Sequence, residues 1–346
     1  MELLKIGTRR STLALLQANE VRRILRVNGI PSELVHLSST GDRSLGGNLS
    51  STVGQFVHGI DKMLIEGKVD ITVHSAKDIP VDETPDVRTI AYLERGETSD
   101  LIITGESSNW SSLPKVLQKE VSNPLVEILN NLPEKSKVGT VSGRRQSFLI
   151  GSRPDLVPIS VRDYLILAEA GIRRLYDSGS LSERHLRLRT VRIREDDWPT
   201  APGQGAIAIN CRSMDVEKRN NLREILNHVV TENAVKQERL ALKRLGGGCL
   251  YPAGIKSREG AIIAAISPEY WRTSYCTGDR YEIYRYQGDV GDLDLSEIGV
   301  SGNKSTPLDE GVKLVTTLTS RRLTTQLINS GVQTVDVPVV ELRSLL

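Results

Sequence analysis

Residues 3–37 read LLKIGTRRSTLALLQANEVRRILRVNGIPSELVHL, and the pattern of apolar residues in this segment indicates the class of fold. Its opening apolar run, Leu3–Gly7, predicts a strand. Over Thr12–Val27 the apolar side chains recur at helical spacing, which predicts an amphipathic helix that ends before Gly29. A second strand is predicted over Glu33–Leu37. The stretch is therefore a strand, a helix and a strand, which is the opening of an α/β protein.

The same alternation continues along the chain. A helix is expected over Phe56–Glu66 and a strand over Val69–His74, and such a start predicts a mainly parallel sheet. After a break near Glu94–Ser99, a second α/β unit is expected. Strands are expected at Asp100–Thr104, Lys137–Val141, Tyr164–Ala168, Val191–Arg194 and Ile207–Asn210. Two later helices are expected over Val216–Val230 and Glu232–Leu245, and the strands of a small α+β unit at Ala261–Ile266 and Tyr281–Gln287.

Composition excludes several classes of protein. The 346 residues carry 45 Lys and Arg against 43 Asp and Glu, which argues against a nonspecific nucleic-acid binder. No apolar run is long enough to span a membrane, and no signal peptide is recognised, so we expect a cytoplasmic protein. The three cysteines are odd in number and form no CxxC, and the histidines lack metal-ligand spacing. We therefore expect neither a disulfide framework nor a metal site.

Charged side chains follow several of the predicted strands. Arg9 follows the first strand, Lys77 and Asp78 follow the third, and Arg144 and Arg145 open a helix after a strand of the second unit. Ligands bind beyond strand ends in open α/β sheets, and a helix N-terminus favours anions. Nearby hydroxyl groups, at Thr140 and Ser142, add donors. We interpret these clusters as a site for a ligand with several carboxylates; the alternative is solvated loop charges.

Two single residues suggest covalent or proton chemistry. Asp78 stands beside a lysine at a strand end, where its carboxylate could stabilise a cation or shuttle protons; the alternative is a surface ion pair. Cys249 follows three glycines, which favours a covalent role over that of an inert buried thiol. Cys211, Cys276 and His74 are interpreted as packed residues without chemistry.

Seven runs, in this order along the chain, resemble the hydroxymethylbilane synthase family, also called porphobilinogen deaminase. They are Ile6–Ala14, Gly41-Asp42, Asp70–Pro80, Gly139–Gln146, Ala170–Leu175, Pro202–Ala206 and Gly247–Cys249. The resemblance implies two domains like type II periplasmic binding proteins with a cleft between them, and a small α+β third domain. The domains are expected at 1–94 with 197–212, at 95–196 and at 213–300, followed by a linker and a strand–helix–strand over 301–346.

The resemblance also implies an activity and a site. Four porphobilinogen molecules would be condensed head to tail onto a dipyrromethane cofactor held by Cys249, with loss of ammonia, and hydroxymethylbilane would be released by hydrolysis. Asp78 would be catalytic. The cofactor and substrate carboxylates would be bound by Arg9, Ser11, Asp42, Lys77, Thr140, Ser142, Arg144, Arg145, Arg162 and Arg174. A monomer is expected, with porphobilinogen as its substrate and neither nucleic acid nor membrane as a partner.

The chain departs from the family pattern in two places. Arg162 runs directly into Asp163–Ala168, where the family has a Gly-Asn-Val-x-Thr-Arg run and a helix, and the lysine of the family's lid loop is absent from Val53–Phe56. The residues after 313 resemble either the closing helix of the third domain or the start of uroporphyrinogen-III synthase. Two alternatives therefore stay open: a degenerate family member, or a carboxylate-binding protein without enzymatic activity on the same fold.

Overall fold

The first strand–helix–strand stretch forms one edge of a five-stranded sheet. The computed structural model describes residues 3–37, 59–82, 85–159, 164–247, 251–268 and 270–293. The sheet has the order β2-β1-β3-β11-β4, with bounds Ser32–His36, Leu4–Thr8, Ile71–Ser75, Ile207–Arg212 and Val87–Tyr92. Helix α1 (Thr12–Val27) is capped by Ser11, whose hydroxyl accepts a hydrogen bond from the backbone N–H of Ala14 at 3.3 Å. Its buried face packs on the sheet through Val21 and Leu25.

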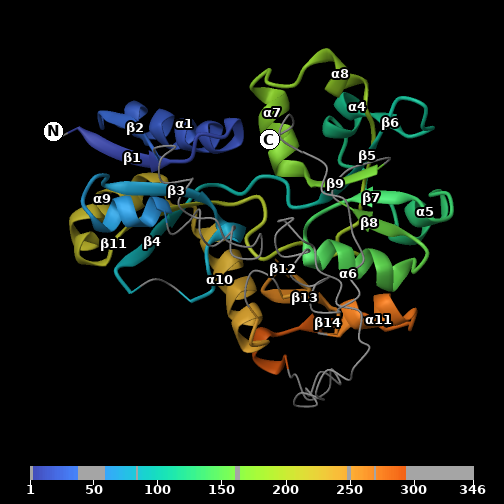
Figure 1. Ribbon diagram of the computed structural model, residues 1–346. Helices are drawn as coiled ribbons and strands as arrows, with labels where there is room; N and C mark the ends of the chain where they lie inside the picture. Colours follow the sequence, from blue (N-terminus) through green and yellow to red (C-terminus); the bar gives the residue numbers. More distant parts are fainter. Residues whose placement is uncertain are drawn as a thin grey trace, which may run out of the picture.

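A second, six-stranded sheet follows, on the right of Figure 1. Its order is β6-β10-β5-β9-β7-β8, with bounds Ser111–Ser112, Arg189–Arg192, Asp100–Thr104, Tyr164–Ala168, Lys137–Gly139 and Val157–Ile159. The helices of this part are α4 (Leu113–Leu117), α5 (Leu125–Asn130), α6 (Gly143–Ser152), α7 (Glu169–Asp177) and α8 (Glu183–Arg187). Its core includes Phe148 from α6 in edge-to-face contact with Trp198.

The third sheet is small and antiparallel. Strands β12 (Ala253–Arg258), β13 (Ala261–Ile266) and β14 (Tyr284–Gly288) form it, and α10 (Val229–Arg244) packs against β12. The remaining elements are α9 (Asn220–Leu226), α11 (Trp271–Thr277) and the short 3-10 helices η1 (Ala76–Asp78), η2 (Ser213–Asp215), η3 (Glu217–Arg219) and η4 (Val290–Asp292). Figure 1 shows this sheet below the second one, with α10 running down beside it.

The α/β fold class is confirmed, with two larger sheets and a small third one. The chain leaves the first sheet after β4, enters the second at β5 and returns from β10 to β11. The domain boundaries themselves stay a prediction, and residues 301–346 lie outside the described part of the chain.

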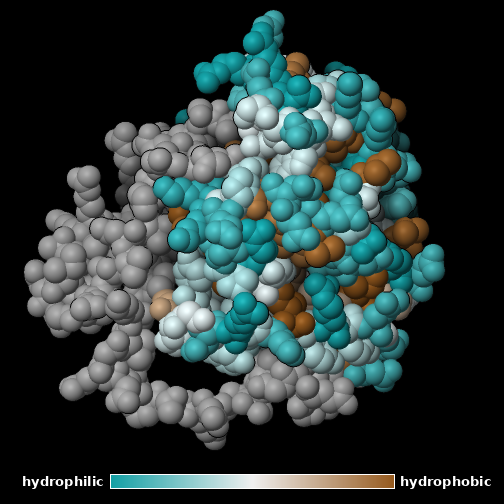
Figure 2. Space-filling view, turned by 90° about the vertical axis from the view of Figure 1, so that its right-hand side faces the viewer, coloured by the Kyte–Doolittle hydropathy of each residue, from teal (hydrophilic) through white to brown (hydrophobic). Residues whose placement is uncertain are grey.

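Figure 2 shows apolar residues interspersed among polar ones on one face. Of the described helices, none combines the length and the apolar character needed to cross a bilayer.

The expected strand direction holds for most of the first sheet, and one expected helix is interrupted. In the first sheet β1, β2, β3 and β4 run in one direction and β11 runs antiparallel to them, so that sheet is mainly parallel, as predicted, with one strand that was not foreseen. In the second sheet β5 runs antiparallel to both β9 and β10. The helix expected over Val216–Val230 is interrupted, because Asn227 and His228 are extended. The His228 ring accepts a hydrogen bond from the N–H of Thr231 and so caps the start of α10.

Candidate active site

The turn after β3 is packed between two other segments of the chain. Lys77 and Asp78 lie in η1, which directly follows the strand. Gly203, at φ +76°, lies against the turn, since an added Cβ atom would stand 3.0 Å from the Cβ of Ala76. Gly205, at φ +86°, touches the segment that joins the two large sheets, because its Cβ atom would stand 2.6 Å from the carbonyl oxygen of Gly96. Only glycine fits these two positions.

A small cavity opens beside this turn. Its volume is about 50 Å³, and the residues that line it come from the surroundings of all three sheets: Lys77, Ile79, Val81, Ser142, Arg144, Ala201, Pro202, Arg239, Leu242, Tyr251 and Ala253. Three of them are cationic, and the Arg239 guanidinium is held in place because it donates to the backbone carbonyls of Ile79 and Pro80. The cavity therefore has the charge to hold an anion.

The N-terminus of α6 forms one wall of the cavity. Ser142 is the N-cap of this helix and accepts from the N–H of Arg145 at 3.5 Å, while the Thr140 hydroxyl accepts from the N–H of Ser142 at 3.3 Å. Arg144 and Arg145 are 5% and 9% exposed. The prediction brought these four residues together correctly, but it did not foresee that both guanidinium groups are buried.

A buried carboxylate binds both arginines. Asp100, at the start of β5, is 0% exposed. It accepts from Arg144 at 2.7 Å, from Arg145 at 3.0 and 2.6 Å, from the indole N–H of Trp198 at 2.9 Å and from Gln204 at 2.8 Å. Burial alone would raise the pKa of Asp100, but the two guanidinium groups hold it well below its usual range. Asp100 is therefore an ionised internal partner of the pair.

The two arginines differ in what else they touch. All three side-chain nitrogens of Arg145 donate, since Nη1 reaches the carbonyl oxygen of Ile166 at 3.0 Å. Arg144 donates to Asp100 and to the carbonyl oxygen of Pro199 at 3.1 Å, lines the cavity, and has an Nε with no partner among the described residues. Arg144 is therefore the member of the pair that faces the cavity.

Lys77 is joined to the same cluster. Its Nζ lies 3.5 Å from Oε1 of Gln204, whose Nε2 donates to Asp100. Burial, followed by the positive charge of Arg145, lowers the pKa of Lys77, while the neighbouring Asp78 acts in the opposite direction. Among the described residues, the Asp78 carboxylate has no hydrogen bond or ion pair. It is therefore available to a ligand.

The other predicted site residues lie further from the cavity or outside the described residues. Arg174, in α7, donates to the carbonyl oxygen of Gly205 at 2.7 Å, and burial lowers its pKa. Ser11 caps α1, and Arg9 stands between β1 and that cap, half-buried. Outside the described residues lie Asp42, Arg162 and Cys249. Tyr251, two positions after Cys249, lines the cavity.

The sequence reasoning missed Asp100, Trp198, Gln204 and Arg239. An aspartate that begins an apolar strand, and a glutamine between two glycines, were weak signals of burial. Of the three residues interpreted as packed, His74 and Cys211 are buried as expected, but Cys276, in α11, is only half-buried. His74 is buried and lies 3.1 Å from Oδ1 of Asp61, and burial raises the pKa of Cys211 to about 11. Within the described residues, no group of side chains is suited to a metal ion.

Comparison with known proteins gives the family. Residues 4–220 match the family model described as porphobilinogen deaminase, dipyromethane cofactor binding domain. The chain is 33% identical to the probable porphobilinogen deaminase of Methanosarcina barkeri over 267 residues, which covers 72% of this chain and 75% of that protein. It is 34% identical to the porphobilinogen deaminase of Acidothermus cellulolyticus over 274 residues, 73% of this chain and 75% of that protein.

Likeness among solved structures is weak. The periplasmic aliphatic sulphonate binding protein SsuA from Escherichia coli is 13% identical, with 71% of each chain covered and a TM-score of 0.32, too low to support an argument. The family predicted from the sequence motifs is nevertheless confirmed by the family model and the curated relatives. The chain belongs to the porphobilinogen deaminase family, the transferases of tetrapyrrole biosynthesis that carry a dipyrromethane cofactor.

Proposed function

We propose that this chain is a hydroxymethylbilane synthase, which condenses four porphobilinogen molecules head to tail and releases the linear tetrapyrrole. The single observation that supports this most is the cationic cavity lined by Lys77, Ser142 and Arg144. Tyr251, close in sequence to the proposed attachment residue Cys249, also lines it. A covalent group with carboxylate side chains would meet its counter-charges there.

The cavity, about 50 Å³ in volume, is far smaller than a dipyrromethane, but the residues that line it fit one of the cofactor's carboxylate side chains. The cofactor's acetate and propionate side chains need donors, and the residues that line the cavity include Lys77 and Ser142, with an ammonium and a hydroxyl group, and Arg144, whose buried Nε has no partner among the described residues. An unpaired buried guanidinium N–H is costly unless a ligand takes it up. When bound, the cofactor supplies the pyrrole carbon to which the first substrate is joined.

Asp78 is the proposed catalytic residue. Each condensation forms a carbon–carbon bond between two pyrroles and releases ammonia, and positive charge develops on the reacting pyrroles. The Asp78 carboxylate follows β3 on η1, beside Lys77, and no described side chain engages it. A fixed carboxylate next to developing positive charge lowers the barrier, and it can also take up the proton of a pyrrole nitrogen.

The remaining candidates are proposed to bind carboxylates of the growing chain. Arg9 and Ser11 lie at the start of α1, and Arg174 lies in α7, so they would bind units beyond the cavity. Thr140 and Ser142 organise the N-terminus of α6, where helix N–H groups favour an anion. For Arg145 the proposed contribution is electrostatic, because its three nitrogens already donate to protein groups. Asp42 and Arg162 keep the roles implied by the resemblance.

Turnover of porphobilinogen tests the proposal. The purified protein should consume porphobilinogen, release one ammonia per pyrrole condensed and form hydroxymethylbilane. The sequence gap after Arg162 favours one alternative, a family member that loads its cofactor but stalls before the tetrapyrrole is complete. That protein would show bound intermediates by mass spectrometry and no free product. A protein that neither consumes porphobilinogen nor carries a pyrrole adduct would contradict the proposal.

A further inference from the structure

We propose that Asp100 is a positioning residue that aligns the arginine pair of the cavity, and that Gln204 couples Asp100 to Lys77. The inference rests on the proposed function, because it concerns how the cavity holds carboxylates. It does not require Asp100 to touch the ligand. Asp100 is fully buried and does not line the cavity, so its effect must pass through the residues that it binds.

The geometry around Asp100 fixes the orientation of Arg144. One guanidinium nitrogen of Arg144 is held by Asp100 at 2.7 Å and another by the carbonyl oxygen of Pro199 at 3.1 Å. Two acceptors fix the plane of a guanidinium group, and Nε is then the side-chain nitrogen of Arg144 that has no partner among the described residues. Asp100 is itself held by Arg145, which binds both of its oxygens, and by Trp198. The position of Arg144 therefore depends on a carboxylate that cannot turn.

Gln204 extends this alignment to Lys77. Its Nε2 donates to Asp100 at 2.8 Å and to the carbonyl oxygen of Thr98 at 2.7 Å, which fixes its Oε1 toward Nζ of Lys77 at 3.5 Å. Gln204 is 1% exposed and lies between the two glycines that pack on η1 and the joining segment. Lys77 and Arg144, which both line the cavity, are thus connected to the same buried carboxylate: Arg144 binds Asp100 directly, and Lys77 is linked to it through Gln204.

Asp100 also sets the charge of the cluster. Without Asp100, Arg144 and Arg145 would lose the buried carboxylate with which both form an ion pair, while Lys77 lies close by. Removing one member of a buried ion pair is strongly destabilising. With Asp100 present, one negative charge opposes the pair and leaves net positive charge for a ligand. The pair can therefore be preorganised before any anion enters the cavity.

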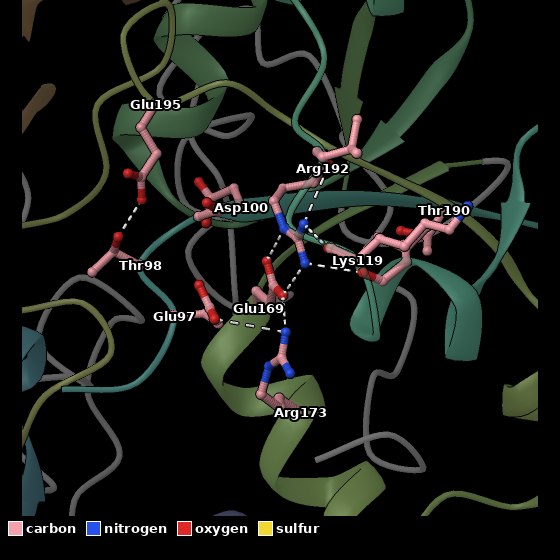
Figure 3. A network of polar contacts seen from close by, with 12 residues as sticks. Glu97, Thr98, Asp100, Lys119, Glu169, Arg173, Thr190, Arg192 and Glu195 are labelled. Carbon is pink, nitrogen blue, oxygen red and sulfur yellow. Dashed lines mark hydrogen bonds and ion pairs between the residues drawn. The ribbon is translucent and has the colours of Figure 1, made fainter. Parts of the chain in front are cut away.

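A second buried carboxylate provides a matched control. Glu169, at the start of α7, is also 0% exposed and binds Arg192 through two bonds of 2.5 Å and Arg173 through one of 2.9 Å. Figure 3 shows its carboxylate directed toward these two arginines, with Asp100 in the same view. Glu169 does not line the cavity beside Lys77, and neither Arg173 nor Arg192 is a candidate ligand residue.

The experiment compares Asp100→Asn with Glu169→Gln. Both variants remove one buried charge and keep the shape of the side chain, so both should lower the melting temperature. Near-ultraviolet circular dichroism establishes the folded fraction, and intact-mass spectrometry gives the dipyrromethane adduct per folded molecule. For Asp100→Asn we expect that ratio to fall roughly 10- to 100-fold, the effect of misplacing a binding group. For Glu169→Gln we expect it to stay within about twofold of the wild type, as for a purely structural charge.

Equal loading of the two folded variants would overturn the inference, since Asp100 would then be a structural charge only. If Asp100→Asn does not fold, Gln204→Leu replaces it, because this change keeps both arginine ion pairs and removes the hydrogen bonds that join Gln204 to Asp100, to Thr98 and to Lys77. Reduced loading of folded Gln204→Leu supports the inference, and normal loading overturns it. A wild-type protein without adduct would instead contradict the proposed function, which separates the two failures.

Discussion

Replacing Arg144 and Arg145 one at a time should separate ligand binding from stability. Leucine removes the charge and the donors of either residue. Arg145→Leu deprives Asp100 of two hydrogen bonds, at 3.0 and 2.6 Å, and the carbonyl oxygen of Ile166 of a third. Arg144→Leu deprives Asp100 of one, at 2.7 Å, and leaves it bound by Arg145, Trp198 and Gln204.

The magnitudes follow from these contacts. Breaking a buried ion pair costs about 3–5 kcal/mol when it leaves a charge poorly compensated, which we expect for Arg145→Leu. A charge-assisted hydrogen bond is worth about 1.5–3 kcal/mol, which we expect for Arg144→Leu. We expect both variants to lose the dipyrromethane, but only Arg144→Leu to do so while it retains most of its stability. Arg144→Lys should restore loading in part, since an ammonium group lacks the two-donor fork.

Urea unfolding, followed by tryptophan fluorescence, and intact-mass spectrometry of the same preparations give both quantities. The control is Arg153→Leu, because Arg153 forms an ion pair with Asp155 at 2.6 Å at the far end of α6 and does not line the cavity beside Lys77. It should lose some stability and load normally. An Arg144→Leu protein that carries the full adduct would refute the assignment of Arg144 to the cavity.

Three further predictions concern other parts of the fold. Asp78→Asn should keep the melting temperature and the adduct but slow porphobilinogen consumption by about 10²–10³-fold, because it removes the charge beside the reacting pyrroles; near-normal turnover would exclude the role. Gly205→Ala should destabilise more than Gly179→Ala, since both glycines have positive φ but only Gly205 meets another backbone, so equal urea midpoints would contradict the close approach. Burial raises the pKa of Glu232, but hydrogen bonds from Arg223 and Lys236 outweigh that effect and lower the pKa from 4.5 to about 2. Its contribution to stability should therefore be present above pH 4.5 and lost as pH falls toward 2, and Glu232→Gln should remove that pH dependence from urea unfolding.

Local patterns predicted the elements that depend on local physics. Helix α1 has the expected bounds, because an amphipathic repeat and a serine cap act within the helix itself. Strands β5 and β9 also have the expected bounds, since a short apolar run is enough to mark a buried strand. Strand direction could not be predicted in the same way. An apolar run does not encode whether its neighbour runs parallel, so the antiparallel β11 was missed.

The site shows the same limit. Arginines at a strand end could be recognised as anion binders from their chemistry, and Ser142 and Thr140 lie beside them as expected. Their partner Asp100 lies more than 40 positions away in the chain, and its burial depends on how β5 packs against α6. No spacing rule reaches such a contact. The sequence therefore indicated that Arg144 and Arg145 could bind anions, but it did not indicate that both of them bind the carboxylate of Asp100.

We propose above that Cys249 carries a dipyrromethane and that the carboxylates of this group lie against the cationic cavity. The most direct test is the intact mass of the purified protein together with peptide mapping, with Cys249→Ser as the comparison. We expect the wild type to exceed its sequence mass by two condensed pyrrole units, located on Cys249, and Cys249→Ser to have the bare mass. An adduct on Cys211 or Cys276, or a wild-type protein with no adduct, would contradict the account.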